Sequence, residues 1–169
     1  MIKKLMQLSF LSILNLFTAC GQQTYEQKLN SIYKNTVERV SPSELDSLRQ
    51  ENELVILDTR SPKEYNVSHI KGATFIDYDK FRVEQLESLD KSQKIIIYCS
   101  VGYRSERIGE GLKEAGYNNV YNLYGGIFQW KNEGYSVYNS KDQVTDSVHT
   151  YNKRWGQWLE NDKGIKVTD

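Results

Sequence analysis

Apolar residues recur along the chain in two spacings that predict different elements. Short apolar or β-branched runs predict strands at residues 54–57, 74–76, 94–98 and 119–123. The runs at 54–57 and 94–98 are continuous, as in strands buried on both faces. Apolar residues three or four apart predict helices at about 25–40, 42–50, 81–89 and 105–115. Because strands alternate with helices, the pattern predicts an α/β fold with a central, mainly parallel five-stranded sheet flanked by helices, of which these runs locate four strands.

Two helix starts share one capping sequence. Residues 41–44 and 61–64 both read Ser-Pro-x-Glu, with serine at the N-cap, proline at the first helical position and glutamate at the third. They predict helices that begin at residues 42 and 62, the second ending near residue 66. The predicted helix at 105–115 contains two glycines, Gly109 and Gly111. Each costs about 0.5–1 kcal/mol relative to alanine, which indicates close packing or mobility there.

The first twenty residues have the pattern of an export signal. Lys3 and Lys4 precede an uncharged run at residues 5–17, which is shorter than the roughly 20 residues of a membrane-spanning helix. Residues 16–20 resemble a bacterial lipobox, which implies that residues 1–19 are a lipoprotein signal peptide and that Cys20 is acylated. We therefore expect a cell-envelope protein, anchored to a lipid bilayer and facing the periplasm or the cell exterior. An ordinary signal peptide, or a buried N-terminal helix with an incidental cysteine, is the alternative.

Length and charge narrow the classes of protein. The chain has 169 residues, of which 38% are hydrophobic, and this suits one compact domain. Its 22 basic residues equal its 22 acidic residues, so no field of one sign favours a nucleic-acid partner. Removal of residues 1–19 would take away two lysines and no acidic residue, leaving a slight excess of negative charge.

Cys99 is the only other cysteine, and its surroundings point to chemistry. An unpaired cysteine in an exported protein is expected to be reactive, although a buried structural cysteine is the alternative. Cys99 directly follows a predicted strand and precedes a predicted helix, whose first turn would stabilise a thiolate. Gly102 lets the loop curl its amides into an anion-binding nest, Arg104 adds a positive charge, and Ser105 is expected to cap the helix. We predict Cys99 as the nucleophile and the following residues as the substrate-binding loop: Ser100, Val101, Gly102, Tyr103, Arg104 and Ser105.

Several segments, in their order and spacing, resemble the rhodanese homology domain family. They are residues 57–60, 64–65, 69–73, 98–105, 116–117, 123–127 and Trp130. The resemblance implies an α/β fold with a parallel sheet and a six-residue loop headed by the cysteine, here residues 99–104. It implies that the Cys99 thiolate takes sulfur from thiosulfate or another persulfide, and that a thiophilic acceptor such as cyanide or a thiol removes it. Neither a metal nor an organic cofactor is required by this chemistry.

The remaining residues of these segments are expected to be structural. We expect Arg60 and Glu64 to pair with each other, and Asp58 and His69 to stabilise loops rather than to act in catalysis. His149 is expected on the exposed surface. Only one cation, Arg104, lies in the loop, whereas some thiosulfate-using relatives have more. This leaves a persulfidated small thiol or protein open as the donor.

The predicted organisation has four parts. A signal peptide (1–19) precedes a tether and N-terminal helix (20–40), a rhodanese-like domain (41–135) and a C-terminal extension (136–169). In this C-terminal extension, helical spacing predicts one shared face for four residues: Tyr151, Trp155, Trp158 and Leu159. We expect the extension to pack onto the domain as a strap, and a surface for a protein partner is the alternative.

Two other functions compete with sulfur transfer. Cysteine phosphatases use a related loop, but they need five residues between cysteine and arginine, and only four separate Cys99 from Arg104. The shorter loop is sized for a single sulfur atom rather than for a phosphate. The other alternative is a non-catalytic binding module at the envelope. Such modules often lack the cysteine, which this chain keeps.

Overall fold

A computed structural model describes residues 23–50 and 54–168 of the chain. The predicted signal peptide and Cys20 therefore lie outside the described residues. Within the described ranges, no helix is both long enough and apolar enough to span a membrane.

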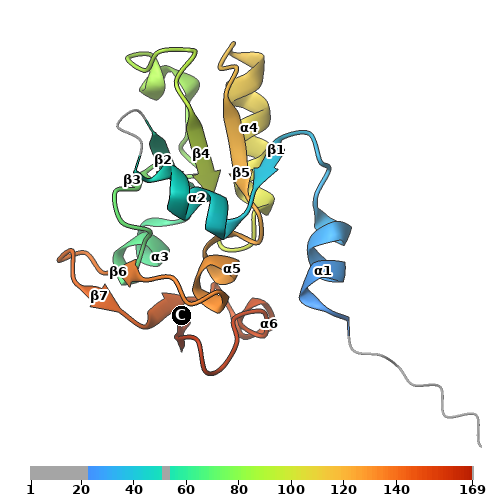
Figure 1. Cartoon of the computed structure of the whole chain (residues 1–169), viewed down its shortest axis with the longest axis vertical. Helices are drawn as coiled ribbons and strands as arrows, with labels where there is room; N and C mark the ends of the chain where they lie inside the picture. Colours follow the sequence, from blue (N-terminus) through green and yellow to red (C-terminus); the bar gives the residue numbers. More distant parts are fainter. Residues whose placement is uncertain (1–22, 51–53, 169) are drawn as a thin grey trace, which may run out of the picture.

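Five parallel strands form the central sheet, as predicted, in the order β1-β5-β4-β2-β3 (Figure 1). The strands are β1 (Glu38–Val40), β2 (Val55–Asp58), β3 (Thr74–Phe75), β4 (Ile95–Tyr98) and β5 (Val120–Leu123). The central strand β4 pairs on both sides, with Ile96 opposite Ile56 of β2 and Tyr121 of β5. Its carboxyl end leads directly to Cys99, so the predicted nucleophile lies at the middle of the sheet edge where such folds bind ligands.

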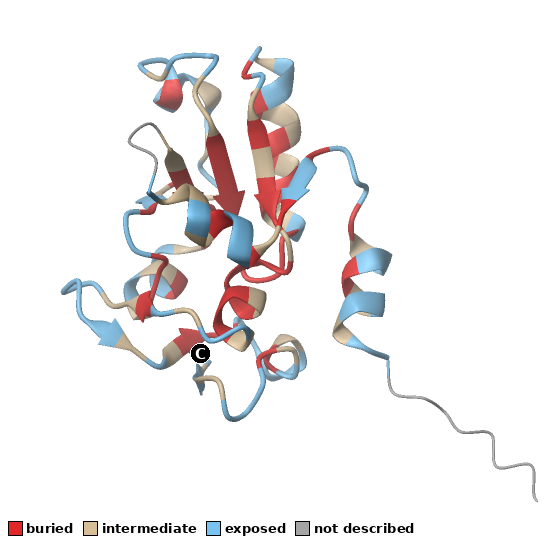
Figure 2. Ribbon diagram, viewed as in Figure 1, coloured by how far each residue is buried: buried red, intermediate tan, exposed pale blue. Residues whose placement is uncertain are grey.

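Helices cover both faces of the sheet. They are α1 (Tyr25–Ile32), α2 (Pro42–Leu48), α3 (Pro62–Val67), α4 (Tyr103–Glu114) and α5 (Gly126–Asn132), with a short 3₁₀ helix, η1 (Val83–Leu86). Successive side chains of β4 point to opposite faces: Ile96 and Tyr98 pack with α1, α2 and α5, whereas Ile95 and Ile97 pack with α4 and η1. All four are fully buried (Figure 2), which explains the continuous apolar run in the sequence.

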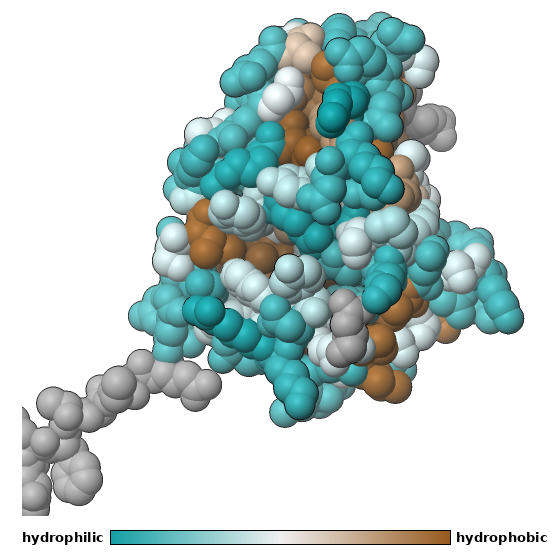
Figure 3. All heavy atoms as spheres, turned by 180° about the vertical axis from the view of Figure 1, so that it is seen from behind, coloured by the Kyte–Doolittle hydropathy of each residue, from teal (hydrophilic) through white to brown (hydrophobic). Residues whose placement is uncertain are grey.

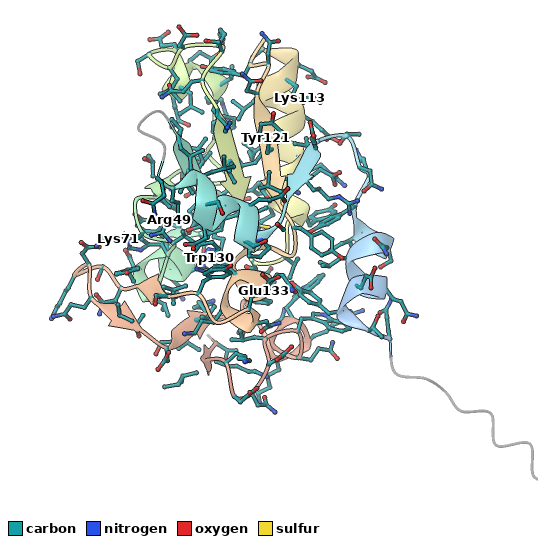
Figure 4. All side chains as sticks on the ribbon, in the orientation of Figure 1. Arg49, Lys71, Lys113, Tyr121, Trp130 and Glu133 are labelled. Carbon is teal, nitrogen blue, oxygen red and sulfur yellow. The ribbon has the colours of Figure 1, made fainter. Side chains whose placement is uncertain are left out.

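The core on the Ile96 and Tyr98 face of the sheet contains the largest fully buried side chain, Trp130. Trp130 of α5 is fully buried and stacks on Tyr135. The Arg49 guanidinium lies 5.5 Å from the Trp130 ring, and Figure 4 shows both residues between α2 and α5. The surface seen from behind the view of Figure 1 is largely hydrophilic, with apolar residues in a few separate patches (Figure 3).

Two predicted helices are wrong in part. The helix expected over residues 25–40 ends at Ile32, and residues 38–40 instead form the edge strand β1. Asn35 adopts a left-handed backbone that turns the chain, and pairing of β1 with β5 then determines the strand. The helix expected over residues 81–89 is reduced to the four residues of η1.

The capping boxes and one helix glycine have clear physical roles. Both predicted boxes form, from Ser41 to Glu44 and from Ser61 to Glu64. A Cβ atom on Gly109 would lie 2.6 Å from Cδ1 of Ile97, so this glycine lets α4 approach the sheet closely. Gly111 has open space around it, and nothing in the structure explains its presence.

The C-terminal extension (136–169) packs against the domain through short elements. They are β6 (Val137–Tyr138), β7 (Val144–Thr145), β8 (Ser147–His149), α6 (Lys153–Gly156) and β9 (Ile165–Val167). Val148 and Leu159 are fully buried, and the Trp158 ring stacks on Tyr25 of α1 at 5.5 Å. The predicted single helix face does not form, because α6 ends at Gly156 before Trp158.

Candidate active site

Cys99 is one of the residues that line a cavity of about 370 Å³. Cys99 is 1% exposed, and within residues 23–50 and 54–168 it is a free cysteine. The cavity is lined by residues from three separate segments: Tyr78, Asp79, Cys99, Ser100, Val101, Tyr103, Arg104, Tyr151 and Trp155. Of the predicted site residues, Ser100, Val101, Tyr103 and Arg104 therefore lie together with Cys99.

The backbone of the Cys99 loop (residues 99–104) has its first four carbonyl groups engaged elsewhere. The Cys99 and Ser100 carbonyls accept hydrogen bonds from the N–H groups of Ile127 (2.9 Å) and Phe128 (3.2 Å) in α5. The Val101 carbonyl accepts from the Tyr33 hydroxyl at 2.6 Å, and the Gly102 carbonyl accepts from Asn122 Nδ2 at 2.8 Å. A trans peptide is planar, so each following N–H points the opposite way from its carbonyl. The Gly102 N–H shows the result, because it donates to Cys99 Sγ at 3.1 Å.

Two glycines make this loop geometry possible. Gly102 has a φ of 92°, and a Cβ atom there would lie 2.2 Å from Tyr33 Oη. Gly126, at the start of α5, has a φ of 58°, and a Cβ atom there would lie 2.3 Å from the Cys99 carbonyl oxygen. A side chain at Gly126 would therefore displace the loop backbone, and one at Gly102 would displace the Tyr33 hydroxyl that holds the loop. Gly102 also takes the N-cap position of α4, which begins two residues earlier than predicted.

The sequence predicts a cap of α4 at Ser105, and this prediction is wrong. Ser105 lies inside the helix and is fully buried. Its hydroxyl donates to Asn122 Oδ1 at 2.7 Å, and the Asn122 amide in turn donates to the Gly102 carbonyl at 2.8 Å. Ser105 thus orients Asn122, and Asn122 holds the loop through the Gly102 carbonyl.

A hydroxyl from α1 joins the loop to the turn before α5. Tyr33 is the C-cap residue of α1 and is buried. Its hydroxyl donates to the Val101 carbonyl at 2.6 Å and accepts from the Gly125 N–H at 2.9 Å. Burial raises the pKa of Tyr33 far above its ordinary value, so the hydroxyl stays protonated and remains a donor.

Glu64 holds the other side of the loop. Its carboxylate accepts from both terminal nitrogens of Arg104, at 2.9 and 2.7 Å, and from the Ser100 hydroxyl at 2.7 Å. Burial alone would raise the pKa of Glu64, but the hydrogen bonds and charge of Arg104, together with Arg60, lower it from 4.5 to about 2. The Arg104 charge that was expected to face a donor is therefore largely compensated by Glu64.

The expected pairing of Arg60 with Glu64 is wrong. Arg60 instead binds Asp58 at 2.7 Å, and both side chains are fully buried. Asp58 ends β2 and Arg60 follows two positions later, so the two side chains meet locally, whereas Glu64 is turned toward Arg104. His69 stacks on Tyr65 with ring centroids 4.2 Å apart and lies outside the cavity residues.

Several residues at the site have no local sequence signal. Tyr78 and Asp79 line the cavity from the segment after β3, and Tyr151 and Trp155 line it from the C-terminal extension. His149 was expected to be exposed but is 4% exposed, and its Nδ1 accepts from the Tyr151 N–H at 3.1 Å. It is buried because β8 pairs with β9 and packs on α3. Among the described residues, no group of three or more His, Cys, Asp or Glu side chains is placed to hold a metal ion.

Comparison with known proteins identifies relatives of this fold and loop. The family model for the rhodanese-like domain matches residues 41–133 of this chain. A tRNA uridine(34) hydroxylase of Cytophaga hutchinsonii is 35% identical over 101 residues, which cover 57% of this chain and 32% of that protein. The chain thus spans about a third of the length of that curated relative.

Solved structures agree with this comparison. The crystal structure of a rhodanese-related protein from Thermoplasma volcanium aligns with a TM-score of 0.53 at 28% identity, over 59% of this chain and 96% of that one. That of a thiosulfate sulfurtransferase from Pseudomonas aeruginosa aligns with a TM-score of 0.55 at 27% identity, over 63% of this chain and 21% of that one.

Proposed function

Because this chain belongs to the rhodanese-like domain family, we propose that it transfers sulfane sulfur through a persulfide on Cys99. The Cys99 thiolate attacks the outer sulfur of a persulfide or of thiosulfate. A new bond forms between Sγ and that sulfur, the donor's sulfur–sulfur bond breaks, and its electron pair leaves with the donor. A thiolate or cyanide then removes the outer sulfur and restores the Cys99 thiolate.

The observation that supports this proposal is the orientation of the loop backbone. Four consecutive carbonyls are bound to donors elsewhere, and the Gly102 N–H contacts Cys99 Sγ. Amides so arranged stabilise negative charge on the thiolate and on a transferred sulfur without reorganisation during the reaction. The tRNA uridine(34) hydroxylase of Cytophaga hutchinsonii has about two thirds of its length outside the matched region, so we propose for this chain only sulfur transfer and not the hydroxylation in that protein's name.

An intact-mass measurement tests the proposal. The protein is incubated with thiosulfate, or with a small-molecule persulfide, and the excess donor is removed. We expect the mass of one added sulfur atom on the wild type, none on Cys99→Ser, and loss of that sulfur after addition of cyanide. If no donor adds sulfur to the wild type, or if Cys99→Ser gains it equally, the chain acts as a binding module and not as a sulfurtransferase.

We also propose that the protein is a lipoprotein of the cell envelope. Support comes from the lipobox-like residues 16–20 and from the short polar segment between Cys20 and α1. Cells expressing the full chain are labelled with an alkyne analogue of palmitate and fractionated. We expect label in the membrane fraction for the wild type and for Cys99→Ser, and none for Cys20→Ser. Equal label on Cys20→Ser would contradict the proposal.

A further inference from the structure

One side of the Cys99 cavity is built by the C-terminal extension, outside the segments shared with the family. Tyr151 and Trp155 line the cavity together with Cys99 and Arg104, although they follow Cys99 by some fifty residues in the sequence. Tyr151 has a φ of 62°, a left-handed conformation that is uncommon for a residue with a bulky side chain. The residue is 55% exposed, and the centre of its ring lies 6.0 Å from the Arg104 guanidinium carbon.

The backbone that carries these two rings is held on both sides. The Tyr151 N–H donates to His149 Nδ1, and the Trp155 N–H donates to Asn152 Oδ1, both at 3.1 Å. The preceding strand β8 pairs with β9, and the following Leu159 is fully buried. Lys28 of α1 lies 5.1 Å from the centre of the Trp155 ring. The two rings therefore form one wall of the cavity, and the backbone that carries them is packed onto the domain.

The charges around the cavity disfavour a strongly anionic ligand. Arg104 is the only cation among the cavity residues, and both of its terminal nitrogens bind Glu64. Asp79 adds a negative charge to the lining. The loop amides near Cys99 offer room for one negative sulfur, whereas the remaining lining is rich in aromatic rings. A donor with a single charged sulfur and an apolar body matches this distribution better than a small dianion.

We propose that Tyr151 and Trp155 are specificity-determining residues that select monoanionic sulfane-sulfur donors with an aromatic or apolar body over thiosulfate. The inference rests on the sulfur transfer proposed above and adds the class of donor. In the reacting complex, the terminal sulfur of R–SO₂–S⁻ or R–S–S⁻ lies at Cys99 Sγ and the group R lies against the two rings. The sulfur–sulfur bond of the donor breaks as the Sγ–S bond forms, and R–SO₂⁻ or R–S⁻ leaves with the electron pair.

Two donors with the same charge and the same leaving chemistry test the wall. Benzenethiosulfonate and methanethiosulfonate differ only in the group R, and kcat/KM is measured for each with cyanide as acceptor. We expect the wild type to favour the benzene donor by about tenfold, the scale of one favourable ring contact. Tyr151→Asn removes the ring while suiting the left-handed backbone, and Trp155→Ala removes the other ring. Both variants should lower the preference toward one, because kcat/KM for the benzene donor should fall more than kcat/KM for the methane donor.

Ile165→Ala is the matched control, because Ile165 is an apolar residue of the same extension that is 62% exposed and does not line the cavity. It should keep the wild-type preference. If the wild type shows no preference, or if Tyr151→Asn keeps it, the proposed wall is overturned while sulfur transfer by Cys99 still stands. If neither donor adds sulfur to Cys99, the proposed function fails and this inference fails with it.

Discussion

Glu64 connects the start of a helix to the loop that carries Cys99. As the third residue of a capping box, it accepts from the Ser61 N–H at 3.0 Å, and the same carboxylate binds Ser100 and Arg104. A buried carboxylate is stable only when it is paired, and here both oxygens are satisfied. The Glu64 side chain thus connects the first turn of α3 to the Cys99 loop.

Glu64→Gln is therefore expected to destabilise the protein and to change its acid sensitivity. The pKa of Glu64 is about 2 in the folded protein, against 4.5 ordinarily, which corresponds to about 3 kcal/mol of stability. Because the folded pKa is depressed, this stability is fully present above about pH 4.5 and is lost as the pH falls toward 2. The variant should lose it at neutral pH and show a flatter stability curve between pH 4.5 and 2, as measured by urea denaturation.

Glu44→Gln provides the control for this prediction. Glu44 occupies the same position in the other Ser-Pro-x-Glu capping box, but its side chain is exposed and accepts its capping hydrogen bond from the Ser41 N–H. Its replacement removes a helix cap without touching Arg104. Equal losses of stability for the two variants would show that the ion pair with Arg104 contributes nothing beyond helix capping.

Helix α1 acts on the site as a brace. Two tyrosines of the same segment reach the Gly125 turn: Tyr25 Oη donates to the Gly125 carbonyl at 2.7 Å, and Tyr33 Oη accepts from its N–H. Only Tyr33 also reaches the Cys99 loop, through the Val101 carbonyl. Its loss would leave a buried N–H and a buried carbonyl without their partner.

We expect Tyr33→Phe to lower the free energy of unfolding by about 2 kcal/mol. We also expect it to slow persulfide formation on Cys99 about fivefold, because the loop amides lose their fixed position. Tyr25→Phe, which removes the same group from the same turn, should leave the rate at the wild-type value. Rates are measured by mass spectrometry at a temperature where all three proteins are folded. A Tyr33→Phe protein that is less stable but equally fast would limit the hydroxyl to a structural role.

Local sequence predicts the elements that local interactions determine. The buried strands β2 and β4, both Ser-Pro-x-Glu helix starts and the strand-to-loop position of Cys99 agree with the sequence analysis. The three-residue strand β1 could not be predicted, because only its pairing with distant β5 defines it. The same holds for the partners of the loop, since Glu64, Tyr33 and Tyr151 are brought to it by the fold.

At the scale of the whole molecule, the C-terminal extension is held on the domain by contacts at several points. Lys131 of α5 binds Asp146 at 2.8 Å, and the Asn132 amide donates to the Trp158 carbonyl at 2.9 Å. Trp158 also stacks on α1, so the extension contacts the beginning of the described chain and its centre. Removing such contacts should affect the stability of the domain and not merely loosen an end.

Leu159→Ala tests this cooperativity. Leu159 is fully buried beside the extension's own strands and within the core that contains Trp130. Its truncation should cost about 2–4 kcal/mol through lost burial and the cavity it leaves. Ile165→Ala, an exposed apolar residue of the same extension, should change stability by less than about 0.5 kcal/mol. Because extension and domain share one core, far-UV circular dichroism and tryptophan fluorescence should report one coincident transition for Leu159→Ala, at a lower urea concentration than for the wild type. Separate transitions would instead show that the extension unfolds on its own, and the wall of the Cys99 cavity would then be lost while the sheet remains folded.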